Sequence, residues 1–480
     1  MDVRSDPHLA LIPRTAEEAA RIAAVVAPPE SFARPEPFED RPAGAATFFG
    51  PADANAFSAV SPNLPFDQRL EFEVGNALFE KIWVSSPAST KASDGLGPLY
   101  NARSCAQCHQ RDGRGHPPEG PGDNAVSLLL RVSVPGGEVG PIPGSHPMRP
   151  HPVYGTQLQD FSVAGVPAEY RLNVTWEEIE VALSGGERAT LRRPIWRAED
   201  LAYGPMGEDA MLSPRVAPQM IGLGLLEAIP AEDILALADP DDLDGDGISG
   251  RANIVWSAEY DQPMLGRFGL KAGLPTLREQ TADAFAGDIG ISTVLRPDNW
   301  GECTAAQQAC RAAPHGGSPV EVDVAALDVV TFYTRNLAVP ARRDLDDPQV
   351  LAGKEVFYET GCAACHTPKH VTHRLSDRPE QSFQLIWPYT DLLLHDMGEG
   401  LADHRPEGRA NGREWRTPPL WGIGLTETVS GHSFFLHDGR ARSLLEAVLW
   451  HGGEAQAARD RVVAMPPGDR AHLIRFLESL

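Results

Sequence analysis

Positive charge and long apolar runs are both scarce in this sequence. The chain has 42 Lys and Arg against 66 Asp and Glu, a formal net charge of −24, and contains no basic tract. This balance argues against nucleic acid as a partner. No apolar run is long enough for a membrane-spanning helix or an export signal. Hydrophobic residues nevertheless make up 42% of the 480 residues, so the chain has enough apolar surface for two or three folded domains.

Cysteine is also scarce, and four of the six cysteines lie in two copies of one motif. Cys105, Cys108 and His109 form one Cys-x-x-Cys-His run, and Cys362, Cys365 and His366 form the other. In c-type cytochromes the two thiols of such a run attach the haem covalently and the histidine binds the iron. The repeat favours two c-type haems over the alternatives, a zinc ribbon or a redox-active dithiol.

The remaining two cysteines, Cys303 and Cys310, lie seven residues apart in a loop-like stretch. We expect a small disulfide there, with two free buried thiols as the alternative. A disulfide and covalent haem both indicate an oxidising compartment. We therefore expect a periplasmic protein whose export signal is absent from this chain.

The two motifs also share their surroundings, which predicts an internal duplication. Each is preceded by a Gly-x-x-x-Phe pattern, at 75–79 and 353–357, and an Arg/Pro segment before a Gly-x-Gly-Leu run occurs at 215–225 and 416–425. We predict a mainly α fold: an extended arm (1–60) around the first domain, a first cytochrome c-like haem domain (61–337) and a second (338–480).

Local patterns add detail to this mainly α prediction. Helices are expected near 15–26, 324–336 and 469–480, and the last should pack on the second haem domain. Glycine and proline total 88 residues, 45 and 43 respectively, so long loops are expected. Strand-like stretches at 126–134 and 171–176 predict a small β insertion in the first domain.

Several longer stretches resemble the dihaem oxidoreductase, putative peroxidase family, some members of which are called thiol oxidoreductases. The matching stretches are 95–101 (GLGPLYN), 244–251 (DGDGISGR), 266–269 (GRFG), 387–391 (WPYTD), 416–421 (RTPPLW) and 435–440 (FLHDGR). The resemblance covers about residues 60–480. It implies a distant relationship to the bacterial dihaem cytochrome c peroxidases and to the dihaem enzyme that matures methylamine dehydrogenase.

The resemblance implies a distal ligand for the second haem. In the peroxidase relatives a Leu-Glu-Glu-Ala-Val helix carries this ligand three residues past its Val. Here Leu444–Val448 places His451 there, where the relatives have Met or Tyr. A bis-histidine iron has a lower potential than a Met/His iron, so the direction of electron flow stays open. Met397 is the rival ligand, and a purely structural role for His451 is the third alternative.

The first haem offers no convincing distal ligand among Met220, His116, His146 and His151. The resemblance instead points to an amide and an acid for peroxide binding and proton transfer. Gln280 would position peroxide and Asp288 would move its proton. The spacing is eight residues where the relatives have about ten, so an ordinary helix-terminal Asp288 is the alternative.

The run from Asp242 to Gly247 resembles the opening of an EF-type calcium loop. Asp242, Asp244 and Asp246 supply oxygens at positions one, three and five, and the Ile248 carbonyl and Asn253 follow. Asp239 and Asp241 are further candidates, and a plain Asp-Gly turn cluster is the alternative. The peroxidase relatives hold calcium between their haem domains.

The sequence therefore predicts a dihaem oxidoreductase that reduces peroxide or oxidises a partner, with a small redox protein as electron donor or acceptor. Electrons would enter at the His366 haem and reach the His109 haem, with Trp256 or Phe268 as an aromatic bridge. The alternative is a dihaem electron carrier without its own substrate. Since the family often occurs beside periplasmic iron-uptake components, the resemblance would connect such a carrier with iron acquisition.

Overall fold

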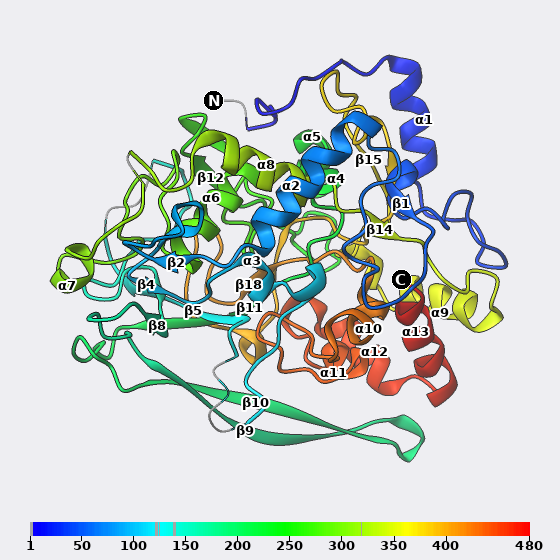
Figure 1. Ribbon diagram of the computed structural model, residues 1–480. Helices are drawn as coiled ribbons and strands as arrows, with labels where there is room; N and C mark the ends of the chain where they lie inside the picture. The colour runs from blue at the N-terminus through cyan, green and yellow to red at the C-terminus, as the bar shows by residue number, and fades with distance from the viewer. Residues whose placement is uncertain (1–2, 121–122, 124, 138–140, 318) are drawn as a thin grey trace.

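The computed structural model describes residues 3–120, 123, 125–137, 141–317 and 319–480 (Figure 1). Helices hold 29% of the residues and strands 19%, the strands being spread over many small sheets. The prediction of a mainly α fold is therefore wrong. The segments between the helices are not plain loops, because many of them pair with distant segments as strands of two or three residues.

The helices form the scaffold around both Cys-x-x-Cys-His motifs. They are α1 (Ala16–Val26), α2 (Arg69–Glu80), α3 (Cys105–Cys108), α4 (Leu223–Glu227), α5 (Ala231–Leu235), α6 (Leu277–Asp288), α7 (Gln308–Arg311), α8 (Val324–Arg335), α9 (Pro348–Glu359), α10 (Thr426–Ser430), α11 (Leu444–Leu449), α12 (Gln456–Ala464) and α13 (Pro467–Ser479). The helices predicted near 15–26, 324–336 and 469–480 correspond to α1, α8 and α13.

The strands pair mostly in twos, apart from one four-stranded sheet in which β5 pairs with β6, β7 and β11. They are β1 (Thr47–Phe48), β2 (Val84–Ser85), β3 (Asp94–Leu96), β4 (Leu99–Tyr100), β5 (Leu128–Pro135), β6 (Met148–Arg149), β7 (Gln157–Leu158), β8 (Phe161–Ser162), β9 (Arg171–Ala182), β10 (Arg188–Glu199), β11 (Met211–Val216), β12 (Ile254–Ser257), β13 (Gln262–Leu265), β14 (Val339–Pro340), β15 (His370–Val371), β16 (Leu385–Ile386), β17 (Leu394–Asp396) and β18 (Glu414–Arg416).

Each Cys-x-x-Cys-His motif is preceded by one helix of a close-packed pair. Helix α2 packs on α8, and α9 packs on α13. A Cβ at Gly75 would lie 2.4 Å from the Val329 carbonyl oxygen, and one at Gly353 would lie 1.9 Å from the His472 carbonyl oxygen. Only glycine permits these approaches. The shared Gly-x-x-x-Phe pattern thus produces the same helix pair twice.

The two Arg/Pro segments detected as a repeat pack against each other. A Cβ at Gly222 would touch the ring of Trp421, and one at Gly422 would touch the side chain of Ile221. Both glycines have positive φ, at 70° and 74°. Ile221 and Trp421 belong to one buried apolar cluster, and this cluster joins the halves of the chain.

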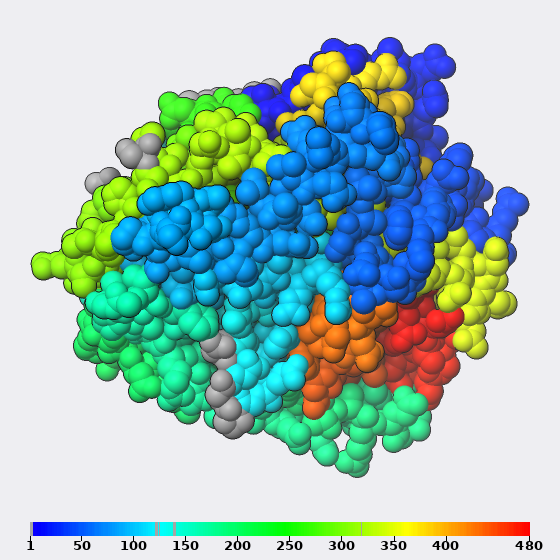
Figure 2. Space-filling model, in the orientation of Figure 1, coloured from blue at the N-terminus to red at the C-terminus, as the bar shows by residue number. Residues whose placement is uncertain are grey.

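The hairpin β9–β10 extends from the first half of the chain to the second. The strands pair antiparallel over their full length, from Arg171 opposite Glu199 to Ala182 opposite Arg188. The hairpin lies beneath the C-terminal helices in Figures 1 and 2. Arg192 Nε donates a hydrogen bond to the Arg440 carbonyl oxygen at 2.9 Å. The strand prediction for 171–176 therefore found the beginning of a much longer element.

The N-terminal segment contacts both halves rather than the first alone. Asp6 forms an ion pair with Arg267 at 2.6 Å, and Glu39 forms one with Lys354 at 2.9 Å. Strand β1 pairs with β14 in parallel. Within the described residues, no helix has the length and apolar character needed to cross a membrane.

Candidate functional site

A single cavity of about 710 Å³ brings the two Cys-x-x-Cys-His motifs together. Most of the predicted site residues line it: Cys105, Cys108, His109, Cys362, Cys365, His366, Gln280, Asp288, His451, Met397, Asp246 and Ile248. Cavities of this size are typical of cofactor sites. The structure therefore collects side chains from both halves around one space.

His109 is oriented as a metal ligand. Its Nδ1 donates a hydrogen bond to the Pro218 carbonyl oxygen at 2.8 Å, so its Nε2 is left free to bind a metal. Burial lowers the pKa of His109 to about 4, which keeps the imidazole neutral. The ring of Phe79, from helix α2, lies 6.2 Å from the His109 ring, centre to centre.

His366 has the same arrangement in the second half. Its Nδ1 donates to the Tyr389 carbonyl oxygen at 3.0 Å, burial lowers its pKa to about 4, and the Phe357 ring lies 6.4 Å away. The four motif cysteines form no disulfide within the described residues. Unpaired thiols, neutral imidazoles and an adjoining cavity fit two haem groups.

His451 and Met397 both line the cavity on the side of the second motif. His451 Nδ1 donates to the Ala447 carbonyl oxygen at 2.7 Å, so its Nε2 is also left free. His366 and His451 lie near enough that a charge on His451 lowers the pKa of His366, in addition to the larger effect of burial. The structure thus keeps both predicted distal candidates, and His451 has the hydrogen bond that ligating histidines use.

Beside the second motif lies a cluster that sequence analysis missed. His395 Nε2 bonds Asp391 at 2.8 Å, and its Nδ1 bonds Glu454 at 2.7 Å and lies 3.4 Å from Cys365 Sγ. Burial opposes protonation, but these partners raise the pKa of His395 well above its usual value. His395 is therefore a buried imidazolium held by two carboxylates. The Asp391/His395 spacing of four residues was the available sequence signal.

Helix α6 supplies Gln280 and Asp288 to the cavity. Asp288 Oδ1 accepts a hydrogen bond from Gln157 Nε2 at 2.8 Å. Burial raises the pKa of Asp288 to about 6, although the charge of Arg131 acts in the opposite direction. The Gln280 Oε1 atom is buried and has no hydrogen-bond partner among the described residues. An acid that titrates near neutrality and an unpaired amide oxygen thus share one wall of the cavity.

Of the four distal candidates for the first haem, only Met220 lines the cavity. The ring of His151 is bound by the Met206 carbonyl and by backbone N–H groups of its own turn. His116 and His146 lie outside the cavity lining, and His146 is exposed. The structure therefore removes the three histidines from consideration.

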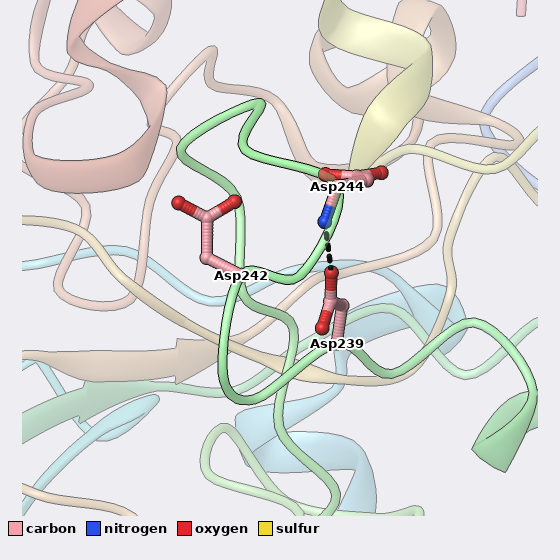
Figure 3. Close-up of side chains that lie close together, drawn as sticks. All are labelled: Asp239, Asp242 and Asp244. Carbon is pink, nitrogen blue, oxygen red and sulfur yellow. Dashed lines mark hydrogen bonds between the residues drawn. The ribbon is translucent and has the colours of Figure 1, made fainter.

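The predicted calcium loop gathers some of its carboxylates but not all of them. Ligand atoms of Asp239, Asp242 and Asp244 lie within 4.8 Å of one another (Figure 3). Asp246 is not part of this group, and its Oδ1 accepts from the Ile248 backbone N–H at 2.8 Å. The Asn253 side chain is buried and bonded to the backbones of Lys271, Glu407 and Arg409. The Asn253 amide is therefore bound elsewhere in this structure and not to the loop.

Of the two predicted aromatic bridge residues, only one lies at the cavity. Trp256 is 41% exposed and does not line the cavity, whereas Phe268 is buried and does. Trp415 and His437 also line it and were missed: their rings stack 3.8 Å apart at 14°. The sulfur atoms of Cys303 and Cys310 lie at bonding distance, as predicted.

Two histidines whose Nδ1 atoms are bound to backbone carbonyls, each beside two free thiols on one shared cavity, fit a protein with two haem sites. Residues 39–480 match the family model described as di-haem oxidoreductase, putative peroxidase. The chain belongs to this family.

Other comparisons add little. No curated protein matches. A solved structure of Kuenenia stuttgartiensis hydrazine synthase is similar at 14% identity and a TM-score of 0.24, over 38% of this chain and 64% of that one. The chain thus spans about two thirds of the length of that protein.

Proposed function

We propose that this protein is a periplasmic c-type dihaem peroxidase with unequal haem sites. The His109 site reduces peroxide, and the His366 site delivers electrons. The observation that carries this proposal is the placement of Gln280 and Asp288 on the cavity wall formed by helix α6. The overall reaction is balanced when one peroxide, two electrons and two protons give two waters.

The bound haem at His109 would supply the iron to which peroxide binds. Asp288 would accept a proton from peroxide and return it to the departing oxygen, because its pKa of about 6 lies near the working pH. Gln280 would orient the peroxide, since its buried Oε1 still requires a hydrogen-bond donor. Gln157 would hold the Asp288 carboxyl in place through its 2.8 Å hydrogen bond.

The His366 site would serve electron transfer. His451 would be the second protein ligand of this haem, with Met397 as the alternative. Cys362 and Cys365 would attach the haem, and the His395 imidazolium would place a fixed positive charge beside the Cys365 sulfur. The electron donor would be a small redox protein with a basic docking surface, because this chain carries a net charge of −24.

Calcium would bind at Asp239, Asp242 and Asp244. The site connects to the second haem through one chain of contacts. Ser249, whose carbonyl accepts from the Asp239 N–H, donates its hydroxyl hydrogen bond to Glu454 at 2.7 Å. Glu454 in turn binds His395. Calcium would therefore fix the loop that holds this carboxylate.

The test is peroxide turnover in haem-loaded Asp288→Asn and Gln280→Leu variants. Both should lose turnover while they retain both haems, and Asp460→Asn, an exposed aspartate on α12, is the matched control. Unchanged turnover in both variants would remove these roles.

Met220 supports a second candidate function. Its side chain lines the cavity and packs in the apolar cluster that contains Cys105. If Met220 ligates the first haem, both irons are closed and the protein is an electron carrier. A Met220→Leu variant distinguishes the two functions: it should leave a peroxidase active, but it should change the visible spectrum of a carrier.

A further inference from the structure

Most of the arginines that line the cavity are paired with carboxylates. Arg215 and Arg405 both bind Glu407, at 2.7 and 2.8 Å, and Arg131 binds Asp283 at 3.4 Å. Each of these arginines thus has a direct carboxylate partner, although Arg215 and Arg405 share one.

Arg114 and Arg416, together with the exposed Arg461, differ from this pattern. Neither Arg114 nor Arg416 has a carboxylate within 4.0 Å among the described residues, and both line the cavity. The carboxylates whose charges act on them, Asp438 and Asp391, are themselves bound to Arg440 and His395. Their hydrogen bonds go to backbone carbonyls: Arg114 donates to Phe434 and Leu436, and Arg416 donates to Gly269 and Thr417. Carbonyl oxygens orient a guanidinium but do not cancel its charge.

Each of the two arginines belongs to one half of the chain and is hydrogen-bonded by the other half. Arg114 follows the first Cys-x-x-Cys-His motif, yet the carbonyls that hold it lie in the second half of the chain. Arg416 ends strand β18 of the second half, and its Nε donates to the Gly269 carbonyl of the first half at 3.0 Å. Each half thus places one arginine without a direct carboxylate partner at its boundary with the other half, beside the shared cavity.

Such an arrangement is costly without an anion. The surrounding protein desolvates both side chains and lowers the pKa of each to about 10, although each side chain keeps some accessible surface. Charged groups in such surroundings are normally paired. A haem carries two propionate carboxylates, and arginine forms bidentate pairs with carboxylates.

We propose that Arg114 and Arg416 are the counter-ions of haem propionates and fix the haems at the boundary between the two halves. This inference rests on the proposed dihaem function. It assigns to both residues an electrostatic role, in which each guanidinium stabilises the reduced form of a neighbouring haem, because reduction makes the haem more negative.

The experiment is a spectroelectrochemical titration of haem-loaded Arg114→Gln and Arg416→Gln proteins, with haem content measured in each. In each variant at least one midpoint potential should fall, and Arg→Lys at the same position should restore most of it. Arg413→Gln, in which a half-exposed arginine three residues before Arg416 is changed, is the control and should leave both potentials unchanged. Both haems bound with unshifted potentials would overturn the inference, whereas parent protein without haem would overturn the proposed function.

If a Gln variant fails to fold, a second measurement on the Lys variants tests the same contact. In Arg416→Lys the charge remains but the planar fork is lost, so the propionate bands of the redox-difference infrared spectrum should shift. Unchanged bands in both Arg416→Lys and Arg114→Lys would contradict the contact.

Discussion

The two halves of the molecule build the same frame around their haem motifs and fill it differently. The frame consists of three features in each half: a glycine-mediated helix pair, a phenylalanine beside the motif histidine, and a backbone carbonyl that accepts a hydrogen bond from the histidine Nδ1. The second half adds His451 and the His395 imidazolium, whereas the first adds Gln280 and Asp288. On the proposed function, the repeated contacts would hold each haem, and the groups outside the repeat would set its role.

Even within the frame the halves differ in one contact. His109 donates to Pro218, which belongs to the repeated Arg/Pro segment, but His366 donates to Tyr389, which does not. The second half therefore uses a different segment for this hydrogen bond. Its copy of the Arg/Pro segment still lines the cavity, through Arg416 and Pro418.

The largest expected effect comes from removing one haem at a time. Cys105→Ala with Cys108→Ala should leave one haem and abolish peroxide turnover. Cys362→Ala with Cys365→Ala should also leave one haem, but peroxide should still perturb its spectrum. Intact-protein mass and optical titration with peroxide measure both results. Equal loss of peroxide binding in the two variants would contradict the division of roles.

Asp288→Asn should lower kcat by about 10²–10⁴-fold, the usual range for loss of a proton-transfer group. The pH profile sharpens this prediction. Because the pKa of Asp288 is raised to about 6, the parent enzyme should lose activity as the pH falls below about 6 and the carboxylate takes up a proton. The residual activity of Asp288→Asn should lack that acidic limb. An unchanged limb would assign it to another group.

His451→Ala should make the second site resemble the first. If His451 is the distal ligand, the low-spin spectrum of this haem should change to high-spin and a new site for small ligands should appear. Met397→Ala is the matched control and should preserve the low-spin signal. The opposite pattern would assign the ligand to Met397.

Removal of calcium should affect the second haem more than the first. Chelation, or Asp242→Asn with Asp244→Asn, should loosen the loop that places Ser249 on Glu454, and the midpoint potential of the second haem should shift. Redox titration with and without added calcium measures this. Potentials that do not respond in either haem would make the aspartates an ordinary turn cluster.

The smallest expected effect comes from replacing the glycine at which each helix pair makes close contact. Gly75→Ala and Gly353→Ala should each destabilise the protein by about 1–3 kcal/mol, the usual cost of overpacking. Gly353→Ala should cost more, because its Cβ would lie 1.9 Å from a carbonyl oxygen against 2.4 Å at Gly75. Denaturant unfolding measures the order, and Gly468→Ala, where a Cβ meets nothing within 4 Å, is the control.

Sequence patterns predicted the features that depend on local chemistry. Helices α1, α8 and α13 were predicted from the sequence near 15–26, 324–336 and 469–480, and the motif histidines follow from their spacing. The mainly α prediction failed because strands such as β1 and β14, two residues each and far apart in sequence, form only through tertiary contact. The His395–Glu454 contact and the contacts of Arg114 and Arg416 join distant segments and had no local signature; only the Asp391/His395 spacing could have been found in the sequence.

The most direct test of unequal haem sites is electron paramagnetic resonance of the haem-loaded protein after addition of one electron per molecule, followed by peroxide. The account predicts a high-spin ferric signal from the first haem that disappears when peroxide is added, together with a low-spin signal that belongs to the second. Low-spin signals alone, unaffected by peroxide, would show two closed haems and would make the protein an electron carrier.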